Sequence, residues 1–111
     1  MTSWADIATA DPDLAARVRH RFESNLHHVL GTVRPDGSPR LSGSEVSFDD
    51  DVRIGMMPGS RKLADVLRDP RVEIHSTPLE DDLANGDARL TGRLRHVGDT
   101  DGRPGSSPPP T

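Results

Sequence analysis

The chain has 111 residues, of which 32% are hydrophobic and 29% are charged, with a formal net charge of -4 at pH 7 and no cysteine. This length allows one small domain, and the negative charge argues against binding to nucleic acid, whose affinity comes mainly from lysine and arginine neutralising phosphates. The lack of cysteine excludes disulfides and cysteine nucleophiles, while the lack of a signal-like apolar core or of about 20 consecutive apolar residues predicts a cytoplasmic protein outside the membrane.

The first 24 residues predict two helices. Ser3 followed by Asp6 is typical of a capping pair ahead of a short helical turn. A longer helix is predicted to start at Asp11, with Pro12 in the favoured first position, and to end near residue 24. The apolar stripe of this helix is formed by Leu14, Ala15, Val18 and Phe22.

The middle of the chain is predicted to form strands. Apolar residues alternate with polar ones, between turn residues such as Pro-Asp-Gly, in five stretches: residues 26–34, 38–48, 52–57, 71–76 and 87–97. The first three stretches are joined by tight turns, which favours an antiparallel meander that curls into a small barrel. The predicted fold class is therefore mainly β with flanking helices.

A short helix between the third and fourth strands carries the strongest functional pattern. Its apolar face is predicted to comprise Leu63, Val66 and Leu67. Its first turn holds Arg61 and Lys62, although the positive pole of the helix dipole disfavours a cation there by about 0.3–1 kcal/mol. A phosphate would compensate, because Ser60, the free backbone N–H groups and the two cations could bind it together. The alternative is an ordinary serine cap followed by two solvated cations.

The composition changes abruptly after Val97. Residues 98–111, GDTDGRPGSSPPPT, contain no apolar side chain that could join a core, and they predict a disordered tail. We expect one domain over residues 1–97, with N-terminal helices at 3–24 and a barrel at 26–97.

The five histidines do not predict a metal site. His27 and His28 are neighbours on a predicted strand and should point to opposite faces. The other three lie on separate elements and match no ligand spacing: His20, His75 and His96. The acidic runs at residues 49–51 and 80–82 are explained as solvated turns, and no hydrolase motif is present.

Three segments together carry a resemblance to a known family: HHVLGTVRPDGSPRLSGSEVSF, VRIGMMPGSRKLADVLRDPRVEIHS and GDARLTGRL. In this order they are similar to the pyridoxamine 5'-phosphate oxidase-like family of flavin-binding split barrels, over residues 26–96. The resemblance implies an antiparallel split β-barrel that binds FMN, or a deazaflavin coenzyme in related members. It also implies a homodimer that holds the cofactor between its subunits.

The most specific part of the resemblance is Ser-Arg-Lys at the start of the short helix, which closes in Leu-Arg-Asp-Pro. It implies that Lys62 is the principal contact to the cofactor phosphate, supported by Ser60 and Arg61. The ring system would then be bordered by Arg40, Ser42, Gly43, Met56 and Met57. The implied activity is that of an oxidoreductase acting on a small organic substrate, in which the flavin does the chemistry and no side chain is identified as an acid or base.

The end of the chain departs from the family. Members usually continue for several more strands, whereas this chain passes into Gly, Ser and Pro. The chain therefore resembles a truncated or frame-shifted member with an incomplete split barrel. An open sheet edge and the lost apolar burial predict marginal stability.

Two other classes of function are compatible with the sequence. The chain could be a non-catalytic module that stores or senses the cofactor, or a remnant with no activity. Haem binding through a histidine such as His27 is a further possibility, because the wider fold has haem-binding members.

Overall fold

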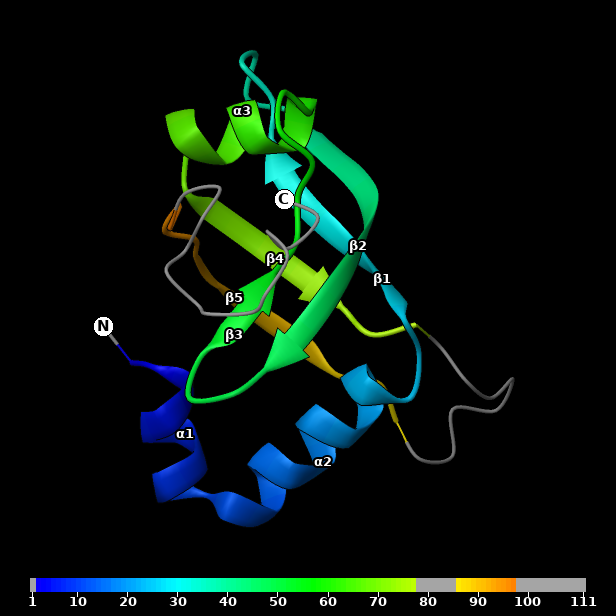
Figure 1. Cartoon of the computed structure of the whole chain (residues 1–111), viewed down its shortest axis with the longest axis vertical. Helices are drawn as coiled ribbons and strands as arrows, with labels where there is room; N and C mark the ends of the chain where they lie inside the picture. The colour runs from blue at the N-terminus through cyan, green and yellow to red at the C-terminus, as the bar shows by residue number, and fades with distance from the viewer. Residues whose placement is uncertain (1, 78–85, 98–111) are drawn as a thin grey trace.

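The computed structural model describes residues 2–77 and 86–97. Within these ranges the chain forms three helices and five strands (Figure 1). In chain order they are α1 (Trp4–Ala10), α2 (Pro12–Glu23), β1 (His27–Val33), β2 (Pro39–Phe48), β3 (Val52–Ile54), α3 (Arg61–Arg68), β4 (Arg71–His75) and β5 (Arg89–Arg93). The predicted tail at 98–111 and the acidic run at 80–82 lie outside the described residues.

Side chains cap both N-terminal helices at the predicted positions. Ser3 Oγ accepts a hydrogen bond from the Asp6 backbone N–H at 3.1 Å, and Asp6 Oδ2 accepts one from the Ser3 N–H at 3.2 Å. Asp11 Oδ1 accepts from the Leu14 N–H at 3.1 Å, and Pro12 is the first residue of α2. These bonds satisfy backbone donors that have no partner inside the helix. The two predicted helix starts are confirmed.

The five strands form one sheet in the order β3-β2-β1-β4-β5, and every neighbouring pair is antiparallel. The hairpin between β1 and β2 turns at Gly37, whose φ of 88° is one that residues with a side chain rarely adopt. β3 and β5 lie at the two edges of the sheet. The described strands therefore make an open half-barrel, consistent with an incomplete split barrel, and the predicted mainly β fold class is confirmed.

The third strand is shorter than its sequence pattern suggested. The pattern extended it to residue 57, but β3 ends at Ile54, and one further backbone hydrogen bond joins the Gly55 N–H to the Glu45 carbonyl at 3.2 Å. Met56 is buried and Met57 is 62% exposed, so the alternation of faces continues after the pairing with β2 has stopped. A period of two in the side chains does not require a partner strand, and it therefore cannot mark the end of a strand.

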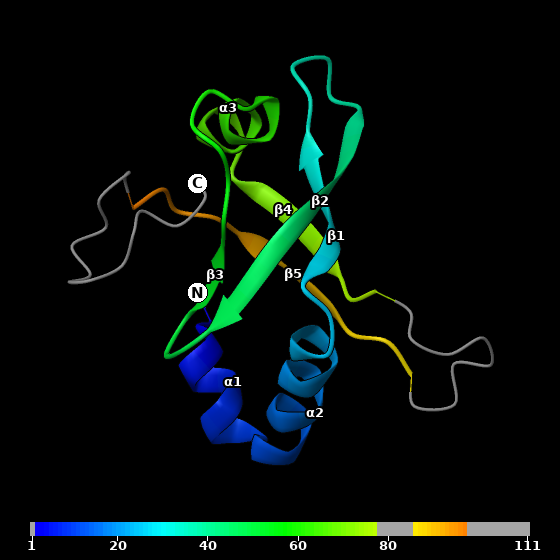
Figure 2. The same ribbon diagram turned by 45° about the vertical axis from the view of Figure 1, so that its right-hand side comes forward.

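The helices lie at opposite ends of the sheet. α1 and α2 pack together at one end, and α3 lies across the other end, beside the β1–β2 turn (Figure 2). None of the helices in the described ranges is long and apolar enough to cross a membrane. The fold thus separates a region built on two helices from one built on a single short helix.

The core lies between the helices and the inner face of the sheet. Its most buried apolar side chains are Phe22, Leu30 and Ile74. Leu14 had been expected in the apolar stripe of α2, but it is 46% exposed. At about 100° per residue, Leu14 lies about 80° from Phe22 around the helix, at the border of the buried stripe. The prediction for this residue is therefore wrong.

The concave side of the half-barrel surrounds an open cavity of about 870 Å³. Its lining is mostly apolar and includes Ile7, Ile54, Met56, Leu63, Ile74 and Leu90. A closed barrel fills such a space with side chains from all of its strands. Here the two edge strands are separated, so part of the core surface remains accessible to solvent.

Candidate functional site

The start of α3 is built by a turn and a serine cap. Gly59 has a φ of 77°, which reverses the chain direction before the helix. Ser60 is the N-cap, and its hydroxyl accepts a hydrogen bond from the Leu63 N–H at 3.2 Å. The first turn of α3 contains no acidic residue, and Arg61 is its first, exposed member. The predicted cation-rich helix start is therefore present, with Ser60 acting as its cap.

Lys62 folds back from α3 onto β2. Its ammonium group donates to the Gly43 carbonyl at 2.7 Å and to Ser44 Oγ at 2.9 Å. Within residues 2–77 and 86–97, no carboxylate forms an ion pair with it. Burial lowers the pKa of Lys62 from its ordinary value of 10.5. A desolvated cation bound only to neutral acceptors keeps its attraction for an anion.

Lys62 is also the only lysine among the 14 lysine and arginine residues of the chain. A lysine presents a compact charge that binds a phosphate as a point, whereas an arginine presents a planar fork of donors. The Lys62 ammonium group thus gives the start of α3 a compact positive charge that no other side chain of the protein can provide.

The predicted residues of β2 are divided between its two faces. Arg40 and Ser42 share the face that α3 covers, because Arg40 lies opposite Thr32 and Ser42 lies opposite Leu30, and both of these partners are buried. Gly43 belongs to the other face, where an added Cβ would meet no atom within 4 Å. Ser42 Oγ is buried without a hydrogen-bond partner in the described part of the chain. A buried hydroxyl without a partner is uncommon and is satisfied when a polar ligand group reaches it.

We call the polar surface where β2 meets α3 the β2–α3 junction; it consists of Arg40, Ser42, Gly43, Ser44, Ser60, Arg61 and Lys62. The two methionines predicted to border the cofactor ring are not both part of it. Met56 is buried and lines the cavity inside the half-barrel, whereas Met57 is exposed just ahead of Gly59 and Ser60. The structure therefore places six polar residues and Gly43 where β2 meets α3, and it separates Met56 from them.

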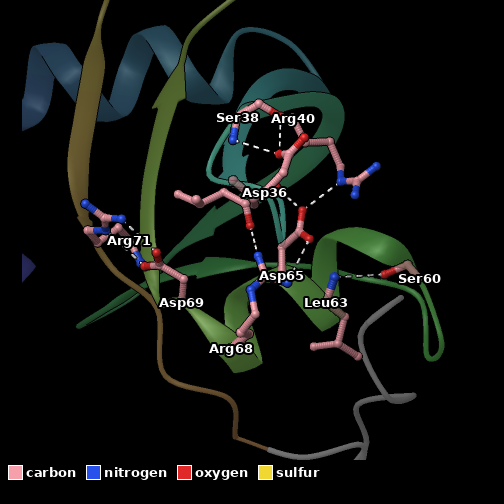
Figure 3. Close-up of polar contacts among 11 residues, drawn as sticks. Asp36, Ser38, Arg40, Ser60, Leu63, Asp65, Arg68, Asp69 and Arg71 are labelled. Carbon is pink, nitrogen blue, oxygen red and sulfur yellow. Dashed lines mark hydrogen bonds and ion pairs between the residues drawn. The ribbon is translucent and has the colours of Figure 1, made fainter.

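Asp65 is the main residue of this region that the sequence pattern did not single out. It lies on α3, is only 1% exposed, and accepts hydrogen bonds from Thr32 Oγ1 at 2.8 Å and from Arg40 Nε at 2.7 Å (Figure 3). Arg68 Nη1 lies 3.5 Å from its other oxygen and also donates, through Nη2, to the Val33 carbonyl. The hydrogen bond from Arg40 is the main reason that the pKa of Asp65 is lowered from its ordinary value of 3.8.

The burial of Asp65 corrects the predicted apolar face of α3. Leu67 had been assigned to that face but is 60% exposed, while Leu63 and Val66 do face the interior. Helix geometry contains the missed signal, since Lys62, Asp65 and Val66 are spaced i, i+3 and i+4 and must share a side of the helix. A charged residue on that side was not expected because buried carboxylates are rare without a paired cation.

The donors of the β2–α3 junction suit a phosphate group. They include one ammonium group, the guanidinium groups of Arg40 and Arg61, and the hydroxyl of Ser42 that has no partner in the described residues. Cations and hydroxyls of this kind form charge-assisted hydrogen bonds to phosphate oxygens. The Asp65 carboxylate, which is bonded to the junction residue Arg40, already accepts hydrogen bonds from Thr32 and Arg40. The arrangement can therefore bind a small anion.

The histidines give a different result. His27 is largely exposed and His28 is buried, so they point to opposite faces of β1 as expected. Across the described ranges, no group of three or more histidine, aspartate or glutamate side chains is placed to hold a metal ion.

Comparison with models of known protein families shows the family to which this chain belongs. The model of the pyridoxamine 5'-phosphate oxidase family matches residues 14–107. The chain belongs to this family. The match covers both the strands and α3, and it bears out the resemblance found in the sequence. No curated protein matches this family member significantly.

Solved structures similar to this family member share its fold. One is described as an F420 reductase, with 21% identity, a TM-score of 0.55, and coverage of 76% of this chain and 75% of the other. A conserved hypothetical protein from Mycobacterium tuberculosis has 23% identity, a TM-score of 0.56 and coverage of 70% and 49%. A heme binding protein from Mycobacterium smegmatis has 23% identity, a TM-score of 0.57 and coverage of 78% and 39%.

These likenesses support the fold and not a shared ligand. The chain spans half or less of the length of the two mycobacterial proteins. The family and the half-barrel architecture are thereby established, while the ligand has to be argued from the β2–α3 junction itself.

Proposed function

We propose that this chain binds FMN, or a deazaflavin coenzyme, with the phosphate of the cofactor at the β2–α3 junction. The observation that carries the proposal is the Lys62 ammonium group, which is partly desolvated and, within residues 2–77 and 86–97, bonded only to the neutral acceptors Gly43 and Ser44. A phosphate oxygen is a stronger acceptor than either of these atoms, because it is charged. Family membership supports the same assignment.

Each predicted residue then has a role that follows from its position. Lys62 would bind the phosphate as a point charge, and Arg61 would add a second cation at the solvent-exposed start of α3. Ser60 would hold the helix start, so that the free backbone N–H groups of the first turn point toward the anion. Arg40 and Ser42 would approach the cofactor from β2. Lys62 can exchange its bonds to β2 for bonds to phosphate without leaving a buried carboxylate unpaired.

The ring system of the cofactor would lie against the exposed part of the same surface. Gly43 offers a strand position without a side chain, and Met57, just ahead of Gly59 and Ser60, offers an exposed thioether. Flat ligands approach a sheet closely where glycine leaves the backbone uncovered. Met56, which lines the inner cavity, would support the site from beneath instead of contacting the ring.

The proposed activity is that of a flavoprotein oxidoreductase acting on a small organic substrate. A bound flavin would supply transfer of a hydride or an electron pair. The chain's own residues would anchor the phosphate, orient the ring system and limit access of water on the β2 side. The proposal includes a homodimer with the cofactor held between subunits, since the half-barrel alone leaves Gly43 and Met57 open to solvent.

Absorbance and mass measurements on the purified protein test this proposal. We expect FMN or a deazaflavin to raise the melting temperature and to change its own absorbance spectrum on binding, with one of the two identified by mass in a native sample. If saturating amounts of both cofactors leave the melting temperature and their spectra unchanged, the proposal is wrong. Turnover of reduced cofactor then separates an enzyme from a module that only stores or senses the cofactor and from an inactive remnant.

Haem binding is a second candidate, favoured by the position of His27. The His27 ring is exposed at the start of β1, and Val29 and Leu41 are exposed apolar residues of the same sheet face. A neutral imidazole is a common axial ligand of haem iron, and an apolar surface suits a porphyrin. A Soret band that disappears in His27→Ala would favour this candidate, and the absence of any Soret band after addition of haem would exclude it.

A further inference from the structure

The carboxylate of Asp65 lies in an unusual place for a charged group. It is almost completely buried in the middle of α3, where its neighbours Leu63 and Val66 pack against the apolar core. An ionised carboxylate is costly in such a position unless cations and hydrogen bonds compensate it. Asp65 has this compensation from Thr32 and Arg40, at 2.8 and 2.7 Å, and from Arg68 at 3.5 Å.

The hydrogen bond to Arg40 uses only one edge of the guanidinium group. Nε of Arg40 donates to Asp65 Oδ2, and neither terminal Nη group has a partner among the described residues. In Figure 3 these two nitrogens point away from Asp65. The Arg40 side chain is only 19% exposed, so its freedom to reorient is small. Asp65 therefore fixes the plane of a guanidinium group whose terminal donors remain available.

The position of Arg40 places these donors next to the Lys62 contact. Arg40, Ser42 and Ser44 follow one another on the same face of β2, with Ser44 bonded to Lys62. On the opposing helix, Lys62 and Asp65 are separated by one turn. Arg40 and Lys62 are thus successive cations along the contact between β2 and α3, and the Ser42 hydroxyl without a described partner lies between them on the strand.

We propose that Asp65 is a positioning residue of the cofactor site, which holds the Arg40 guanidinium group so that its terminal nitrogens face the anion bound at the β2–α3 junction. This inference rests on the proposed function. Without the carboxylate, Arg40 would still carry its charge but would lose the partner that sets its orientation. Asp65 therefore sets the orientation of the Arg40 guanidinium group, and it acts through Arg40 without touching the cofactor.

A double-mutant cycle in cofactor affinity tests the coupling between the two residues. The variants are Asp65→Asn, Arg40→Gln and the double variant, titrated with FMN and with the deazaflavin coenzyme. We expect each single change to weaken cofactor binding about tenfold. The affinity of the double variant should lie within about twofold of that of Arg40→Gln. If the single effects multiply to about a hundredfold loss, Asp65 does not act through Arg40 and the inference is overturned.

Thr32→Val is the matched control. It removes another hydrogen bond to Asp65 but leaves the bond between Arg40 and Asp65 in place. We expect Thr32→Val to lower the melting temperature while changing FMN affinity by less than about twofold. An Asp65→Asn protein with a lowered melting temperature and wild-type affinity would show that the carboxylate is only structural, which would also overturn the inference.

Arg40→Lys keeps the test valid if Asp65→Asn does not fold. Lysine preserves the positive charge. An ammonium group that is bonded to Asp65, however, has no second set of planar N–H donors that points toward the anion. We expect Arg40→Lys to bind FMN as weakly as Arg40→Gln, within about twofold. Wild-type affinity in Arg40→Lys would overturn the inference. Failure of the unmodified chain to bind either cofactor would overturn the proposed function itself, whereas binding with additive effects overturns the positioning role alone.

Discussion

At the end of the sheet that carries α1 and α2, two aromatic pairs join the elements beside the ion pair of Arg21 and Asp87, whereas at the α3 end the charged side chains Lys62 and Asp65 make the hydrogen bonds to β2. Phe22 packs edge-on against His28, with ring centroids 5.0 Å apart, and Trp4 packs edge-on against Phe48 at 4.9 Å. At the α3 end the corresponding contacts are Lys62 with Ser44 and Asp65 with Arg40. The same sheet is therefore covered by two regions with different physical chemistry.

At the aromatic end, the buried imidazole of His28 has a hydrogen-bond partner for each ring nitrogen. His28 Nε2 donates to the Phe22 carbonyl at 2.6 Å, and its Nδ1 accepts from the Thr77 N–H at 3.1 Å. Every polar atom of this imidazole is used, and the ring joins the end of α2 to the end of β4. At the α3 end, the donors without described partners are those of Arg40 and Ser42, and both residues belong to the β2–α3 junction.

This difference distinguishes the main source of stability from the proposed site of binding. Burial of large apolar side chains provides most of the free energy of folding, while an unpaired buried donor lowers stability and raises affinity for a ligand that can pair with it. We therefore expect substitutions at the aromatic end to change the free energy of unfolding and substitutions at the α3 end to change ligand affinity. Three predictions test this separation.

The largest effect is expected for Phe22→Ala. Removal of a fully buried phenyl ring should lower the free energy of unfolding by about 3–5 kcal/mol, because it leaves a cavity between α2 and the sheet. Denaturant titration followed by circular dichroism measures this change. Leu14→Ala on the exposed side of α2 is the control and should change stability by less than about 0.5 kcal/mol. Similar small effects for both variants would contradict an aromatic core at this end.

A smaller effect, on binding alone, is expected for Lys62→Ala. Loss of a charge-assisted contact to phosphate should weaken FMN affinity by about 1.5–3 kcal/mol. Arg17→Ala is the control, since it removes one positive charge from an exposed position on α2, far from α3 in the fold. Titration calorimetry of the three proteins separates a local contact from an effect of net charge. Equal affinity losses in both variants would mean that no specific phosphate contact exists at Lys62.

The smallest effect is expected for the pH dependence of binding. Burial lowers the pKa of Lys62 below 10.5, so the folded protein loses this charge at a lower pH than the unfolded chain does. Stability should therefore rise with pH across the window between the two pKa values, while FMN affinity falls, by about twofold where half of Lys62 is neutral. Titrations from neutral to alkaline pH measure this fall. Lys62→Arg should show none of it, and a parallel fall in that variant would assign the effect to another group.

Much of the fold follows from local sequence patterns. The capping pair of Ser3 and Asp6, the proline at the start of α2 and the Pro-Asp-Gly turn between β1 and β2 each act within a few residues, and all are present in the structure. Element boundaries were predicted less well, because β3 ends where its pairing with β2 stops and not where its own alternation of apolar and polar residues stops. The exposure of Leu14 and Leu67 was likewise decided by which side of each helix meets the sheet.

For the candidate site, the sequence by itself determined the unusual pair of cations in the first turn of α3 and the family that explains them. Only the tertiary structure decided that Lys62 meets Ser44, 18 residues earlier, and that Asp65 is buried against Thr32 and Arg40, 33 and 25 residues away. The physical reason is that caps, turns and periodicities depend on neighbours along the chain. The compensation of a buried charge depends instead on strand register and on how a helix docks, and neither leaves a local pattern in the sequence.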